Sequence, residues 1–124
     1  MVRSLLVLTL TLAATGASAQ TLAKKGEQVF QQCSGCHAVA RGQKSLAGPH
    51  LAGVVGRKAA ADRSFAGYTP ALKKISTRTT WTPQQLDRFL ANPAGVAPGT
   101  SMAFVKVAKP ADRQAVIAYL QTKK

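Results

Sequence analysis

Acidic residues and cysteines are scarce in this sequence. Only 4 Asp and Glu stand against 17 Lys and Arg, so the formal net charge of the 124-residue chain is +13. A chain this basic is drawn to an acidic partner, which is a nucleic acid, an anionic membrane or an acidic protein surface. The basic residues are spread along the chain without a run of five or more, which does not favour nucleic acid. We expect the charge to steer the protein toward an acidic docking surface on another protein.

Aromatic residues and long apolar segments are also rare. Aromatics make up 6% of the chain, so the protein has little material for a core of its own, and a large apolar cofactor would supply what is missing. The apolar stretch at residues 4–16 is shorter than the roughly 20 residues that a membrane span needs. The sequence therefore predicts no stable insertion in a membrane.

The amino terminus has the pattern of a secretory signal peptide. A short positive start with Arg3 precedes the apolar stretch, and Ala17-Ser18-Ala19 resembles a cleavage site. The alternative, a membrane anchor, is disfavoured by the length of the stretch. Residues 1–19 are predicted to be removed, which leaves one domain at residues 20–124 with a charge of +12, because only Arg3 is lost. The bacterial style of the signal makes the periplasm the expected compartment.

Helical periodicity and helix-start signals predict an all-α fold with long loops. The expected helices are residues 21–33, 68–75, a segment from Thr82 to Asn92, and a last segment that opens at Pro110. Thr82 is expected to cap its helix and to form a capping box with Gln85. Residues 34–67 and 94–107 are expected to be loops, and no segment indicates a strand. Loops this long are unusual in a small domain, and they make sense if they pack against a prosthetic group.

The two cysteines stand two residues apart, in Cys33-Ser34-Gly35-Cys36-His37. This is the attachment signature of c-type haem. The two thiols add to the two vinyl groups of the porphyrin, and the adjacent histidine can then ligate the iron. A thiol–disulfide site of the thioredoxin type is an alternative, but it belongs after a strand in a β/α pattern. A zinc site needs further ligands, and His50 is the only one available.

The second axial ligand decides between an electron carrier and a ligand-binding enzyme. After the signal peptide the chain has one methionine, Met102, and one histidine besides His37, namely His50. Met102 lies on a loop without helical periodicity, which favours a ligand over core filler. His50 follows His37 too closely and is expected to be a surface or packing residue. Ligation by His37 and Met102 fills both axial positions and predicts one-electron transfer without enzymatic activity.

Residues 24–124 resemble class I cytochromes c, close to mitochondrial cytochrome c and its bacterial relatives. Gly26 and Phe30 match the first helix of that family where it crosses the last, and Val116 and Tyr119 match their partners. The resemblance implies one haem attached through Cys33 and Cys36. It also implies that the carbonyl of Pro49 accepts a hydrogen bond from His37. The other residues that it places around the haem are Arg57, Tyr68, Trp81, Phe89, Thr100 and Phe104.

The resemblance further implies a soluble, monomeric carrier that passes electrons between larger redox partners, such as an oxidase, a reductase or a photosynthetic reaction centre. Two other kinds of haem protein stay open: an enzyme or gas sensor with an open sixth position, and a subunit bound within a larger enzyme. Phe89 and Leu72 depart from the family, which often has tyrosine and asparagine there. Several lysines common around the haem edge are absent, which leaves Lys44, Lys106 and Lys109 as candidates for docking.

Overall fold

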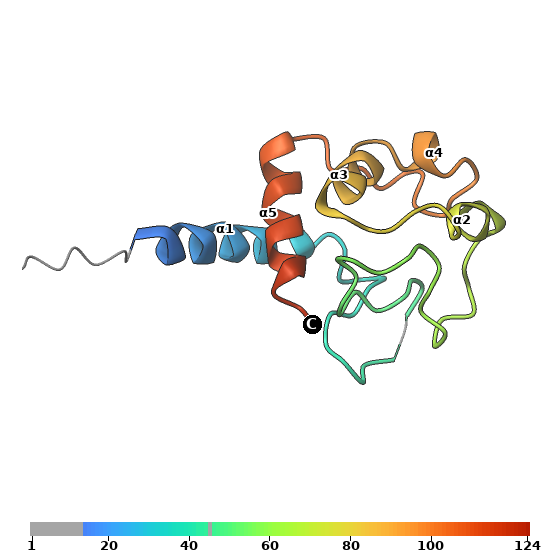
Figure 1. Ribbon diagram of the computed structural model, residues 1–124, viewed down its shortest axis with the longest axis horizontal. Coiled ribbons are helices and arrows are strands. Elements are labelled where there is room, and N and C mark those ends of the chain that lie inside the picture. Colours follow the sequence, from blue (N-terminus) through green and yellow to red (C-terminus); the bar gives the residue numbers. More distant parts are fainter. Residues whose placement is uncertain (1–13, 45) are drawn as a thin grey trace, which may run out of the picture.

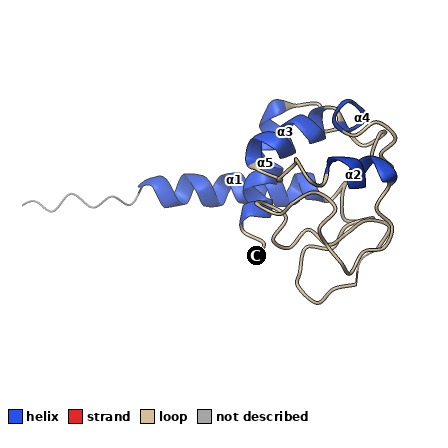
Figure 2. Ribbon diagram, turned by 45° about the vertical axis from the view of Figure 1, so that its right-hand side comes forward, coloured by secondary structure: helices blue, strands red, loops and turns tan. Residues whose placement is uncertain are grey.

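The computed structural model describes residues 14–44 and 46–124. The elements in chain order are α1 (Ala14–Phe30), α2 (Pro70–Ile75), α3 (Pro83–Ala91), α4 (Pro93–Val96) and α5 (Pro110–Gln121) (Figure 1). Within the described residues there is no strand, only an isolated antiparallel bridge between Lys58 and Thr80 (Figure 2). The predicted all-α fold with long loops is confirmed.

Helices α1 and α5 cross in close contact (Figure 1). Gly26 lies at the crossing, where an added Cβ would collide with the carbonyl oxygen of Ala115 and would lie 2.7 Å from the Cβ of Tyr119. The rings of Phe30 and Tyr119 stack beside it, with centroids 5.5 Å apart. The absence of a side chain at Gly26 lets the two backbones approach, and the packing of the Phe30 and Tyr119 rings stabilises the crossing. The expected crossing of the first and last helices is confirmed.

Three boundaries differ from the expected ones. The helix expected at residues 68–75 begins later, because α2 runs from Pro70 to Ile75 with Thr69 as its cap. The first helix was expected at residues 21–33, but α1 runs from Ala14 to Phe30, and residues 31–36 form turns. The expected loop 94–107 begins with the short helix α4, because the Asn92 side chain accepts a hydrogen bond from the N–H of Gly95 at 3.1 Å and caps a new turn.

The predicted capping box of α3 is half formed. The Thr82 hydroxyl accepts a hydrogen bond from the N–H of Gln85 at 3.2 Å. The N–H of Thr82, which the Gln85 side chain was expected to bind, donates instead to the carbonyl of Thr80 at 2.7 Å. The backbone turn before the helix therefore replaces one of the two bonds of the box.

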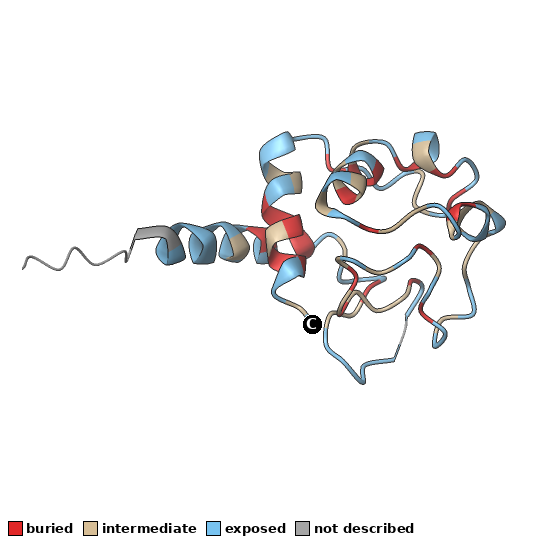
Figure 3. Cartoon of the chain, viewed as in Figure 1, coloured by how far each residue is buried: buried red, intermediate tan, exposed pale blue. Residues whose placement is uncertain are grey.

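The amino-terminal part of α1 lies apart from the rest. Residues 16–22 are all exposed, and Figure 3 shows this part of the helix projecting away from the other elements. Of the predicted signal peptide, residues 1–13 lie outside the described residues, while 14–19 begin α1. None of the described helices is long and apolar enough to cross a membrane.

One core joins α1, α2, α3 and α5 to the loops that connect them, including the long loop before α2. Its buried members come from all of these segments: Phe30, Val54, Ala59, Ile75, Trp81, Leu86, Phe89, Leu90, Ala97, Val107, Val116, Ile117, Tyr119 and Leu120. The loop is fastened by backbone bonds, among them the N–H of Gly53 to the carbonyl of Lys123 at 2.6 Å. A segment without regular structure is thus fixed against the last helix.

Candidate haem-binding site

The attachment signature lies in one tight turn directly after α1. The N–H of Cys33 donates to the carbonyl of Phe30 at 2.7 Å, and the N–H groups of Cys36 and His37 donate to the carbonyl of Cys33 at 3.1 and 2.9 Å. Cys33 is half-buried and Cys36 is exposed, and both are free thiols. The turn therefore brings two thiols and one imidazole together, as the covalent attachment of a haem requires.

The His37 ring is buried and held in one orientation. Its Nδ1 lies 2.7 Å from the carbonyl oxygen of Pro49, so Nδ1 carries the proton and donates it. Gly48 leaves room for the ring, because a Cβ there would lie 2.8 Å from Nδ1 and would collide with Cε1. Burial is the main cause that lowers the pKa of His37. The hydrogen bond to Pro49 raises this pKa, and the positive charge of Arg57 lowers it further. The result is a neutral imidazole with its Nε2 lone pair left for a metal.

The Cys33 thiol does not have the property of a redox-active nucleophile. Burial, and then the neighbouring Cys36, raise the pKa of the Cys33 thiol. A nucleophilic cysteine needs the opposite, a lowered pKa that gives a thiolate at neutral pH. A zinc site finds no support either, because the described part of the chain contains no cluster of three or more His, Cys, Asp or Glu side chains that could hold a metal.

Met102 lies on the loop between α4 and α5 and points its side chain at the core. Its N–H donates to the hydroxyl of the buried Thr100 at 3.2 Å. Met102 and Cys33 are both partly buried and pack against the same core cluster. Gly99 has a φ of 93°, which favours glycine, and a Cβ added there would reach van der Waals contact with Ala71 on α2. The fold thus gathers the attachment turn and the predicted methionine ligand around one core.

The other residues expected around the haem divide into two groups. Trp81 and Phe89 are buried with ring centroids 5.0 Å apart, so they belong to the core that Met102 touches. The Tyr68 hydroxyl accepts a hydrogen bond from the N–H of Asp62 at 3.2 Å, and burial is the main cause that raises its pKa. Phe104 is not brought together with them: its side chain is 98% exposed.

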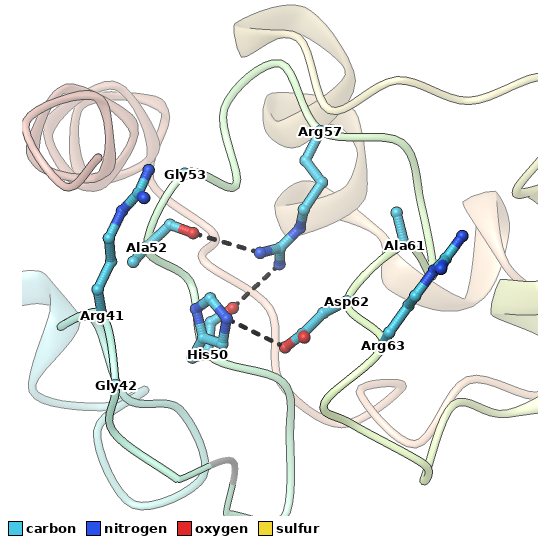
Figure 4. A pocket seen from close by; sticks show the side chains of 9 residues that line it. All are labelled: Arg41, Gly42, His50, Ala52, Gly53, Arg57, Ala61, Asp62 and Arg63. Carbon is cyan, nitrogen blue, oxygen red and sulfur yellow. Dashed lines mark hydrogen bonds and ion pairs between the residues drawn. The ribbon is translucent and has the colours of Figure 1, made fainter.

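Arg57 fastens the loop that carries Pro49. Its guanidinium donates to the backbone carbonyls of His50 at 3.0 Å and Ala52 at 3.3 Å (Figure 4). His50, expected to be a surface or packing residue, places Nε2 3.4 Å from Oδ2 of the buried Asp62. A surface hollow of about 430 Å³ lies over these residues and includes none of the residues of the attachment turn.

Asp62 was not singled out in the sequence, although it is the one buried acidic residue of the described chain. Its Oδ1 accepts hydrogen bonds from the N–H of Ser64 at 2.9 Å and from the Ser64 hydroxyl at 2.6 Å. Burial alone raises the pKa of Asp62, but the two bonds from Ser64 and the charges of His50 and Arg57 together lower it below its ordinary value. The charged form is therefore preferred in the folded protein.

Asp62→Asn should reduce stability at neutral pH, with a loss that fades in acid. Because the folded-state pKa of Asp62 lies below that of the unfolded chain, its contribution is present above the unfolded pKa and disappears as the pH falls through the folded pKa. We expect a loss of about 1 kcal/mol at pH 7, since charged hydrogen bonds exceed neutral ones. Denaturant unfolding at pH 7 and near pH 3 measures it.

Asp112→Asn is the control, because the ion pair of Asp112 with Lys25 at 3.3 Å lies at the surface, where such pairs contribute about 0.5 kcal/mol or less. If the free energy of unfolding of the Asp62→Asn variant differed from that of the parent by the same amount at both pH values, the Asp62 carboxylate would not be the source of the stability.

The donor set fits a covalent haem. Two free thiols, an oriented neutral imidazole and a thioether are present, and the latter two are the ligands that hold iron in one class of cytochromes.

Arg113 and Asp87 were also missed in the sequence: the Nε of Arg113 donates to Oδ1 of Asp87 at 2.7 Å. No local pattern marks this pair, because its partners are 26 residues apart and meet only when α3 and α5 pack.

Comparisons with known proteins agree with this site. The family model described as cytochrome c matches residues 23–124. Cytochrome c2 of Agrobacterium tumefaciens is 42% identical over 77% of this chain and 86% of its own length. Cytochrome c2 of Rhodomicrobium vannielii is 46% identical over 79% of this chain and 76% of its own. The structure of cytochrome cH from Methylobacterium extorquens superposes with a TM-score of 0.73 at 39% identity, covering 82% of this chain and 98% of that one.

The match spans the attachment turn, both predicted ligands and the crossing of α1 with α5. The chain belongs to the cytochrome c family: it is a class I c-type cytochrome that holds one covalent haem through Cys33 and Cys36 and carries electrons, and it is not an enzyme.

Proposed function

We propose that His37 and Met102 are the axial ligands of the haem and that the protein is an exported, soluble carrier of single electrons. The observation that carries the proposal is the His37 imidazole, which is buried, neutral and fixed by its Nδ1–H bond to Pro49 at 2.7 Å. The partly buried Met102 packs against the core cluster that also meets Cys33. When bound, the haem supplies one iron that alternates between two oxidation states, and a thioether ligand raises its reduction potential.

The residues of the chain hold this arrangement still. Pro49 fixes the plane of the His37 ring and raises its basicity, as partners of metal-ligating histidines do. Trp81 and Phe89 belong to the buried core against which Met102 packs. With both axial positions filled by protein, no position is left for a substrate, and the geometry need change little between oxidation states. This arrangement favours a carrier over a haem enzyme or a gas sensor.

The charge and the amino terminus support the finer parts of the proposal. Removal of residues 1–19 by signal peptidase would leave a domain with a charge of +12. Such a domain suits transient, steered encounters with redox proteins that have acidic docking surfaces. An oxidase, a reductase or a reaction centre is a partner of this kind. We propose a periplasmic monomer that binds neither nucleic acid nor the membrane interior.

The pyridine haemochrome spectrum of the purified protein tests haem attachment, and the far-red absorption band of methionine-ligated ferric iron tests the ligand. We expect one haem with two thioether links and a far-red band at neutral pH. The His50→Asn variant should keep the band, because His50 is the other histidine of the chain and is not a ligand in this proposal. A colourless protein with two free thiols, made in a host that matures c-type cytochromes, would refute the attachment, and a missing band would refute the ligand. Gel filtration as a stoichiometric complex would instead favour a bound subunit.

A further inference from the structure

The loop that carries Met102 is held at both ends. At its amino-terminal end Ala97 is fully buried. At its carboxyl-terminal end Val107 is buried, and its N–H donates to the carbonyl of Leu90 in α3 at 2.8 Å. Between these ends the Met102 side chain packs against the core, while Phe104 is exposed. The position of the thioether therefore depends on how firmly the two ends are fixed.

Arg113 of α5 fixes the carboxyl-terminal end. Its Nη1 donates to the carbonyls of Val107 and Ala108, both at 2.9 Å, while its Nε donates to Oδ1 of Asp87 in α3 at 2.7 Å. The Arg113 side chain is 12% exposed and that of Asp87 is 42% exposed. One planar guanidinium thus joins α5, α3 and the end of the loop, an arrangement that the single ammonium group of lysine does not reproduce.

We propose that Arg113 is a positioning residue for Met102, which keeps the thioether on the iron by clamping the end of its loop to α3. The inference rests on the proposed function, because it takes Met102 as an axial ligand. With Met102 as a ligand, the thioether would leave the iron when the loop opens, and opening would be easier once the carbonyls of Val107 and Ala108 are released from Arg113. The Asp87 carboxylate makes the clamp strong, since hydrogen bonds between charged groups are about twice as strong as neutral ones.

Imidazole added to the ferric holoprotein measures this opening. It binds iron only when the thioether has left, so its apparent dissociation constant falls in proportion to the rise in the open fraction. We expect Arg113→Gln to bind imidazole about tenfold more tightly than the parent, which corresponds to a rise of about 1.4 kcal/mol in the relative stability of the open form. Arg113→Lys should fall between the two. Arg88→Gln, which removes the same charge from the exposed face of α3, is the control and should bind within twofold of the parent.

A merely structural role predicts a different pattern. Arg113→Gln would then lower the denaturant midpoint and leave the imidazole affinity unchanged, which would overturn the inference. If Arg113→Gln does not take up haem, Asp87→Asn, a milder change at a more exposed side chain, carries the same test.

The Met102→Ala background separates this inference from the proposed function. There the sixth position is already open, so adding Arg113→Gln should tighten imidazole binding no further. A continued tenfold gain in that background would overturn the role of Arg113. A parent protein without the far-red band would instead refute the ligand assignment itself.

Discussion

Replacing Met102 by alanine should abolish the far-red band of the ferric protein and open the iron to small ligands. The chain offers no second thioether between residues 20 and 124, and His50 turns its Nε2 toward Asp62 at 3.4 Å. The reduced variant should therefore bind carbon monoxide readily. If the parent keeps its loop closed in 99 of 100 molecules, the apparent affinity rises about 100-fold. The reduction potential should fall, because the thioether that favours ferrous iron is lost.

Ser101→Ala is the matched control for this change. Ser101 is the exposed neighbour of Met102 on the same loop, so the control alters the loop without touching the thioether. It should keep the far-red band and a slow reaction with carbon monoxide. A Met102→Ala protein that retains the band, or a parent that takes up carbon monoxide as fast as the variant, would show that another group ligates the iron.

The Phe89 departure gains a physical meaning from the structure. Phe89 lies against Trp81 with ring centroids 5.0 Å apart, inside the core that Met102 touches. A phenylalanine offers no hydroxyl to the methionine sulfur, so the chain keeps Met102 in place by packing and by the fixed ends of its loop.

The sequence was a good guide to features that are local or that involve glycine and aromatic residues. The attachment turn follows from five consecutive residues. The crossing of α1 with α5 was implied by the family resemblance at Gly26, and the structure gives its physical reason, because the approach of Ala115 requires a residue without a side chain. The half-formed capping box could not be foreseen, because the N–H of Thr82 bonds to Thr80 in a turn that has no helical pattern.

Charged contacts between distant segments could not be predicted from the sequence, for a different reason. In the sequence, Arg113 and Asp87 look like ordinary solvated charges on two separate helices. Only the packing of α3 against α5 brings the Nε of Arg113 within 2.7 Å of Oδ1 of Asp87. The exposure of Phe104 was equally unforeseen, since the family resemblance placed this residue around the haem. The attachment turn was thus predictable from spacing, and the charged contacts that fasten the surrounding loops were not.

Gly26→Ala should strongly destabilise the fold, although the same change at an open helical site is favourable. The helix gains about 1 kcal/mol from alanine in place of glycine. At Gly26, however, the new Cβ meets the backbone carbonyl of Ala115 and the Cβ of Tyr119, neither of which can move without shifting α5. Overpacking of this kind costs about 3 kcal/mol. The net loss of about 2 kcal/mol lowers the melting temperature by roughly 8–16 °C for a domain of this size.

Thermal unfolding of the holoprotein measures this loss, and Gln28→Ala on the exposed side of α1 is its control, expected to change stability by about 0.5 kcal/mol or less. Both variants place an alanine in α1, one at the crossing with α5 and one on the exposed side. A Gly26→Ala protein as stable as the Gln28→Ala protein would mean that α1 and α5 lie farther apart than the contact of Gly26 with Ala115 requires. Retention of the far-red band in Gly26→Ala at low temperature would locate the loss in the helix crossing, away from the iron.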